Sequence, residues 1–155
     1  MSRGPYRGVY CALLDDPDFQ RLTPDARLAF FTCRLCPQAG PAAIFRYYPE
    51  LLALQSGLPP ERLELALLEL ERERWISREG VVLWVRNGLR QDPNMHLSDA
   101  KHRKAVLRAV AALPRHDIVV MFCDYYQLTR PFVGPPKALP RALEGVSPPG
   151  APRTS

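Results

Sequence analysis

Hydrophobic residues recur every three or four positions along several stretches of this chain, which is the spacing of an amphipathic helix. The first stretch follows Thr23, a residue type that caps helix N-termini, and Pro24, which suits the first helical position. Leu28, Phe31 and Leu35 are spaced along one side of the predicted helix. We expect these three side chains to face the core.

A pair of helices joined by a tight turn is predicted farther along the chain. The shorter helix begins at Pro49 and ends at Gly57, where the turn needs the positive φ that glycine adopts easily. The longer helix follows two prolines, and Leu63, Leu67 and Leu70 share one of its faces. This spacing predicts a helix-turn-helix unit with a common leucine core.

Short runs of β-branched and aromatic residues flank the helix pair. Residues 42–48 predict a strand before it, and residues 75–85 predict a hairpin that turns at Gly80. The resulting order is helix, strand, helix, turn, helix, hairpin, which is that of a winged helix-turn-helix. We therefore expect a mainly α fold with a small β-hairpin, in which residues 1–90 form the winged helix-turn-helix domain.

Two more helices are predicted after the hairpin. Ser98 is a candidate N-cap for the first, which should turn Val106, Val110 and Leu113 inward. Asp117 is a candidate cap for the second. Both helices should pack on the winged helix-turn-helix domain as an extension.

The chain is expected to end in a disordered tail. Residues 129–155 hold 7 of the 17 prolines and few large apolar side chains, a composition that does not support a packed core. The domain boundaries are therefore expected at residues 1–90, 91–128 and 129–155.

Charge is distributed unevenly along the chain. Residues 1–85 hold 10 basic and 11 acidic residues, whereas residues 86–155 hold 11 basic and 5 acidic ones, so the net charge of +5 arises from the second half. Such an excess points to a polyanionic partner, nucleic acid first, with a solvated basic surface as the alternative.

The helix that follows Gly57 is a poor reader of a DNA groove because five of its eight charged residues are acidic. Arg62, near its start, is the one residue placed to read a base. A basic cluster at residues 101–104, which includes His102, lies at a predicted helix N-terminus, where the helix dipole disfavours cations. A pattern that works against local stability indicates a function. The nucleic-acid-binding candidates are Arg46 on the short strand, Arg62, Arg78 at the expected wing tip, Arg86, Arg90, Lys101, Arg103, Lys104 and Arg108.

Enzymatic chemistry and metal binding are not expected. The chain has no Walker-type glycine loop, His-Glu-x-x-His or Gly-x-Ser-x-Gly motif. Cys33 and Cys36 form a CxxC within an apolar helix, while Cys11 and Cys123 stand alone. We expect four small, buried or half-buried thiols and no cofactor, with zinc or redox chemistry as the alternative.

No apolar run approaches the roughly 18 residues of a membrane span, and the N-terminus lacks the pattern of a signal peptide. We therefore expect a cytoplasmic protein with no membrane partner.

Four stretches of this chain together resemble one protein family. They are DDPDFQRLTPDARLAFF, GPAAIFRYYPELLALQSGLPPERLELALLELERERWI, VVLWVRNGLRQDPN and LRAVAALPRHDIVVMFCDYY. In order and character they are similar to the N-terminal winged-helix region of phage replisome organisers, the DnaD-like replication-initiation proteins of phages and prophages. The resemblance covers residues 6–128 and implies non-enzymatic DNA binding and recruitment of replication proteins.

Full-length members of that family often carry a second helical domain that contacts single-stranded DNA and the helicase machinery. Here a proline-rich segment follows Tyr126 instead, so the resemblance does not extend to helicase loading.

These observations predict a DNA-binding accessory protein of phage or prophage replication initiation, with double-stranded DNA as its first partner. One alternative is a protein-interaction module that docks on host replication or transcription machinery through its acidic helix. A second alternative is a winged-helix transcriptional regulator. The oligomeric state is left open.

Overall fold

A three-stranded antiparallel sheet lies at the centre of the computed structural model, which describes residues 6–128; the predicted tail, residues 129–155, lies outside them. The strands are β1 (Ile44–Arg46), β2 (Ile76–Glu79) and β3 (Val82–Val85). Their order is β1-β3-β2, and Ile44 pairs with Trp84 across the first ladder. The predicted short strand therefore joins the predicted hairpin along β3.

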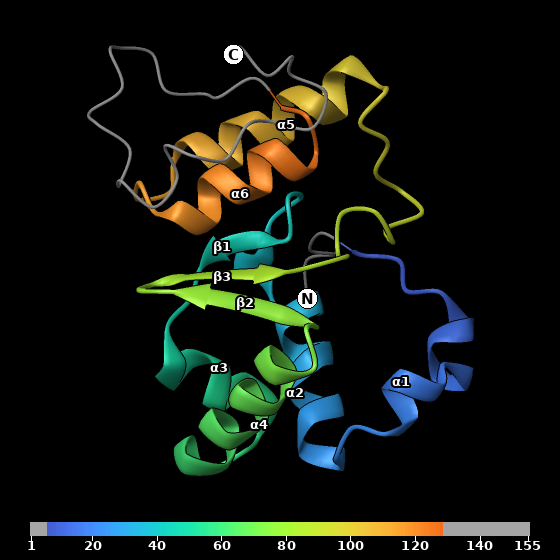
Figure 1. The fold of residues 1–155 in the computed structure, drawn as a ribbon, viewed down its shortest axis with the longest axis vertical. Coiled ribbons are helices and arrows are strands. Elements are labelled where there is room, and N and C mark those ends of the chain that lie inside the picture. Colours follow the sequence, from blue (N-terminus) through green and yellow to red (C-terminus); the bar gives the residue numbers. More distant parts are fainter. Residues whose placement is uncertain (1–5, 129–155) are drawn as a thin grey trace, which may run out of the picture.

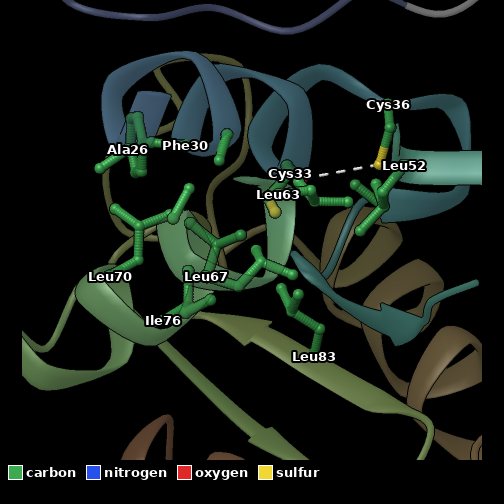
Figure 2. Packing of buried hydrophobic residues seen from close by; sticks show 14 of the residues in the cluster. Ala26, Phe30, Cys33, Cys36, Leu52, Leu63, Leu67, Leu70, Ile76 and Leu83 are labelled. Atoms are coloured by element: carbon green, nitrogen blue, oxygen red, sulfur yellow. Dashed lines mark hydrogen bonds between the residues drawn. The ribbon is translucent and has the colours of Figure 1, made fainter. Parts of the chain in front are cut away.

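Three helices cover one face of this sheet (Figure 1). They are α2 (Pro24–Leu35), α3 (Pro49–Ser56) and α4 (Pro60–Arg72). Leu63, Leu67 and Leu70 of α4 are all buried, as their spacing predicts, and Figure 2 shows them packed against α2 and the sheet. The turn between α3 and α4 places Gly57 at φ 76°, which confirms the predicted need for glycine.

Two helices cover the opposite face of the sheet (Figure 1). They are α5 (Ala100–Ala111) and α6 (Asp117–Tyr125), and Val106 and Val110 of α5 point inward as predicted. Strand β3 is consequently buried on both sides, with Leu83 and Val85 in one core and Val82 and Trp84 in the other. The described part of the chain is thus a sheet between two helical layers.

The N-terminal segment lies beside α2 (Figure 1). It contains a 3₁₀ turn (η1, Cys11–Asp15) and a short helix, α1 (Pro17–Gln20). The Asp16 carboxylate accepts a hydrogen bond from the backbone N–H of Asp18 at 2.8 Å, so this aspartate caps α1. Phe19 of α1 then packs edge-on against neighbouring aromatic rings, those of Phe30, Phe31 and Trp75.

The predicted core stripe of α2 is wrong for Leu28 and Leu35. Leu28 and Leu35 are 43% and 48% exposed, and Phe31 is only partly buried. The helix instead turns its smaller residues toward α4, because small side chains let two helix backbones approach closely. The small buried residues are Ala26, Ala29 and Cys33, and Phe30 and Arg34 are buried as well.

The N-caps of the last two helices also differ from the prediction. Asp99, and not Ser98, caps α5, and its Oδ1 accepts from the backbone N–H groups of Lys101 at 2.8 Å and His102 at 3.2 Å. These hydrogen bonds hold the pKa of the Asp99 carboxyl below its usual value. A charged carboxylate is the stronger acceptor for orphan amides, which explains why the helix begins one residue later.

Helix α6 is capped from the hairpin. Asp117 is its first helical residue and not its cap, whereas Glu79 of β2 accepts from the Ile118 N–H at 2.8 Å. The end of the hairpin is thereby fixed to the start of α6. None of the helices in residues 6–128 is long and apolar enough to cross a membrane.

Helix α4 ends in a conformation that an L-residue adopts at a cost. Arg74 has φ 64°, in the left-handed region, while the Trp75 N–H donates to the Leu70 carbonyl at 2.8 Å to close the last turn. We expect Arg74→Gly to raise the free energy of unfolding by about 0.5–1 kcal/mol, because glycine removes the strain of the positive φ. This gain exceeds the loss that comes from the greater freedom of glycine in the unfolded chain. Urea unfolding followed by circular dichroism measures the change.

The control is Arg74→Ala, which removes the same exposed side chain and charge without relieving the backbone. A gain as large in Arg74→Ala as in Arg74→Gly would show that the side chain, and not φ, sets the cost.

Candidate nucleic-acid interface

Charged side chains of α4 form hydrogen bonds and ion pairs with α2 and the residue before it. Arg62 donates two hydrogen bonds to the carboxylate of Asp25 on α2, at 2.8 and 2.7 Å, and this partner lowers the pKa of that carboxyl. Glu69 accepts from the backbone N–H and the hydroxyl of Thr23 at 3.1 and 2.5 Å. Arg62, the residue expected to read a base, is therefore already paired.

Arg78 lies in the body of β2, facing α4, and not at the wing tip as expected. Its guanidinium donates to both oxygens of Glu64 at 2.9 Å and to Glu71, and the side chain is only 11% exposed. Burial by itself would lower the pKa of Arg78, but the two carboxylates raise it overall. A guanidinium enclosed in this way is not offered to a phosphate.

Two other candidates lie around the last turn of α6. The Arg90 guanidinium donates to the Tyr125 hydroxyl at 3.4 Å, and that of Arg103 donates to the Gln127 carbonyl at 3.1 Å. A helix C-terminus favours cations because its carbonyls point outward. Both side chains are therefore engaged within the chain near the end of α6, and Arg103 donates to a backbone carbonyl there.

Arg46 and Arg86 lie beside aromatic rings. Arg86 stands 4.8 Å from the centroid of the buried Trp84 ring and donates to the Ser77 hydroxyl at 3.2 Å. Arg46, on edge strand β1, is exposed and lies 5.8 Å from the ring centroid of the half-exposed Tyr48. Of the two, Arg46 is exposed and Arg86 is half-buried.

The remaining candidates form a line along α5. Lys101, Lys104 and Arg108 are all exposed, and their i, i+3, i+7 spacing places them on one face, opposite the buried Val106 and Val110. No carboxylate of the described residues lies within ion-pair distance of any of the three. We call Lys101, Lys104 and Arg108 the α5 stripe; it spans about 10 Å of helix at 1.5 Å per residue.

Acidic and basic residues are unevenly distributed along the described part of the chain. Residues 6–85 hold nine basic and eleven acidic residues, net −2, whereas residues 86–128 hold seven basic and four acidic ones, net +3. The segment that carries α5 and α6 is therefore the basic one. The rest of the positive charge of the second half belongs to residues 129–155, which lie outside the described residues.

A buried ion pair was not anticipated from the sequence. Arg34 of α2 lies 3.6 Å from the Asp92 carboxylate, with side chains only 5% and 4% exposed, and also donates to the Gly8 carbonyl at 3.2 Å. Burial lowers the pKa of the Arg34 guanidinium. An arginine within the apolar run of α2 was the available signal. The pair ties the N-terminal segment and the loop after β3 to α2, so its role is structural.

Three of the four cysteines are buried, and one is not. Cys33, Cys36 and Cys123 are buried, as expected, whereas Cys11 is exposed. The Cys36 thiol donates to the Cys33 carbonyl at 3.7 Å (Figure 2), and burial raises the pKa of both thiols, which disfavours the nucleophilic thiolate. Within residues 6–128, no three His, Cys, Asp or Glu side chains are grouped closely enough to hold a metal ion.

Comparison with known proteins finds no family model, curated protein or solved structure that matches this chain.

The pairing of Arg78 with two carboxylates makes a prediction about stability. Arg78→Met should lower the free energy of unfolding by about 1–2 kcal/mol at neutral pH, because two glutamates lose a partner that is largely desolvated. The hydrogen bonds from Arg78 hold the Glu64 pKa below its usual 4.5. Their contribution is therefore present above about pH 4.5 and is lost as the pH falls through the lowered value.

Urea unfolding over a pH series tests this. The wild-type and Arg78→Met curves should converge below pH 4.5, while Arg21→Met, which breaks the exposed pair with Asp18, should follow the wild type throughout. Parallel wild-type and Arg78→Met curves at every pH would rule out this ion pair as the source of the difference.

Proposed function

We propose that this protein binds nucleic acid, double-stranded DNA first, through the α5 stripe. One observation carries the proposal. Arg62 of α4 and Arg78 of the hairpin are neutralised by carboxylates of the same chain, whereas the stripe is exposed and has no carboxylate partner among the described residues.

The stripe suits a phosphate backbone. Its three cations follow one another over about 10 Å, and a DNA strand presents one phosphate per 3.4 Å of axis. Neutralising phosphates releases condensed counterions, so such binding is strong at low salt and weak at high salt. Arg46, exposed on the edge of the sheet, is a further cation available to solvent.

The order of elements from α2 to β3 supports a winged helix-turn-helix interpretation of the α2–α4 layer and the sheet. In most such proteins the second helix of the pair enters the major groove. That mode is disfavoured here, because α4 is acidic and its Arg62 is paired with Asp25. The hairpin is also covered on both faces, so a second surface, formed by α5, is the better candidate for contact.

The biological role proposed is that of an accessory factor in phage or prophage replication initiation. This part rests on the resemblance of residues 6–128 to phage replisome organisers. Contacts with host replication proteins would follow from such a role.

Fluorescence anisotropy with a random-sequence duplex and a single strand, each over a salt series, tests the proposal. Lys101→Ala/Lys104→Ala/Arg108→Ala should weaken duplex binding at low salt. The slope of log K against log salt should become shallower by about 2–3, because each lost phosphate contact removes about 0.9. Arg103 is left intact because it closes the end of α6.

The matched control is Arg21→Ala/Arg62→Ala/Arg74→Ala, which removes the same charge from the opposite helical layer. This variant should keep the wild-type slope. No duplex binding by the wild type at low salt, or equal losses in both variants, would overturn the proposal. Preferential binding of the single strand would leave the α5 stripe as the binding surface but make single-stranded DNA the partner.

A further inference from the structure

The outward face of α4 carries two leucines that the described chain leaves uncovered. Leu65 is 67% exposed and Leu68 is 48% exposed. Three positions apart on a helix, they are neighbours and form a continuous apolar surface. This face points away from the sheet, because the opposite face buries Leu63, Leu67 and Leu70.

A charge stands at each end of this leucine pair. Glu61 precedes Leu65 by four residues, and Arg72 follows Leu68 by four residues. The spacing of four, three and four is that of the contact line of a coiled coil. We call these four residues, Glu61, Leu65, Leu68 and Arg72, the α4 seam.

The α4 seam is complementary to itself. When two identical helices pair antiparallel about a two-fold axis, residue i of one copy meets residue j of the other, and j meets i. With the axis between Leu65 and Leu68, each Leu65 meets a Leu68 of the second copy. Each Glu61 then meets an Arg72 of the second copy, so both ends of the seam carry opposite charges.

The charges beside the seam are already satisfied within the chain. On one side Arg62 pairs with Asp25, and on the other Glu64 and Glu71 pair with Arg78. A second helix laid on the seam would therefore meet no desolvated, unpartnered charge from these residues.

The charges of the seam itself are held loosely or not at all. Arg72 is 72% exposed and lies 3.6 Å from the neighbouring Glu73 carboxylate, which is an exposed pair of little strength. Glu61 is exposed and has no ion-pair partner among the described residues. Both are thus free to exchange into a contact with a second copy.

A groove runs beside the seam, between the start of α2 and α4. It has a volume of about 490 Å³, and Leu65 forms part of its wall together with Pro24 and Ala66. This space is large enough for a leucine side chain, so a leucine of a second copy can insert into it.

We infer that a second copy of this chain docks antiparallel along the α4 seam, with the Leu65–Leu68 contact at its centre and Glu61–Arg72 pairs at its ends. This inference does not depend on the proposed function. Because α4 and α5 lie on opposite sides of the sheet (Figure 1), such a dimer would carry its two α5 stripes on its outer sides.

Sedimentation equilibrium of the full chain over a concentration series is the first test. The wild type should show a monomer–dimer equilibrium, and Leu68→Asp should weaken it by at least about a hundredfold, because two buried leucines are lost. Met121→Asp is the matched control, since Met121 is equally exposed, at 48%, but lies on α6 across the sheet. Circular dichroism checks that each variant is folded.

Charge exchange tests the antiparallel register. Glu61→Arg and Arg72→Glu should each weaken the dimer by about tenfold, because each places like charges at both ends of the seam. The double variant Glu61→Arg/Arg72→Glu restores opposite charges and should recover wild-type association. An equimolar mixture of the two single variants should form a heterodimer of comparable strength.

A wild-type chain that stays monomeric at every concentration would overturn the inference, even if α4 then captured a host protein. Equal effects of Leu68→Asp and Met121→Asp would also overturn it. Failure of the double variant to recover would exclude the antiparallel register. DNA binding by the α5 stripe is measured separately, so either proposal can fail without the other.

Discussion

Strand β3 has to be buried on both sides, and the arrangement of the other elements follows from this. Four consecutive apolar residues, Val82–Val85, alternate between the two faces of the sheet. One set needs the α2–α4 layer and the other needs α5 and α6, as the two separate cores show. The helices after the hairpin therefore supply the cover for one of the two faces of the sheet.

Covering both faces also decides which surfaces remain for binding. The hairpin is fixed at its end by Glu79, which caps α6, and along its length by Arg78, which holds two glutamates of α4. Glutamates of α4 that would face solvent in an isolated helix pair here form ion pairs with Arg78 of β2. The net negative and net positive parts of the described chain consequently lie on different layers, and each layer is left with a different kind of exposed face.

Much of this fold follows from local sequence patterns. The leucines of α4, the turn at Gly57 and the hairpin at Gly80 all lie where spacing and residue type predict them. Spacing alone predicts the wrong face of α2, because the pattern favours large apolar residues, whereas close helix packing selects the small Ala26 and Ala29. Whether leucines such as Leu28 end in a core depends on a partner helix, which periodicity does not identify.

The candidate site was less predictable for a related reason. A list of cations in the sequence does not show which of them meet a carboxylate from a distant element. Asp25 lies 37 positions before Arg62, and Glu64 lies 14 positions before Arg78. The α5 stripe, in contrast, is local: its spacing on one helix was visible, and its exposure follows from the inward direction of Val106 and Val110.

The double burial of β3 has a consequence for the order in which the chain is made. The sheet and the α2–α4 layer are complete at residue 85, but Val82 and Trp84 face water until α6 has left the ribosome. For that interval the nascent chain presents an apolar sheet face with edge strands beside it, which is the kind of surface that aggregates or attracts chaperones. The length of this interval is set by the residues from the end of β3 to the end of α6, because only α5 and α6 cover that face.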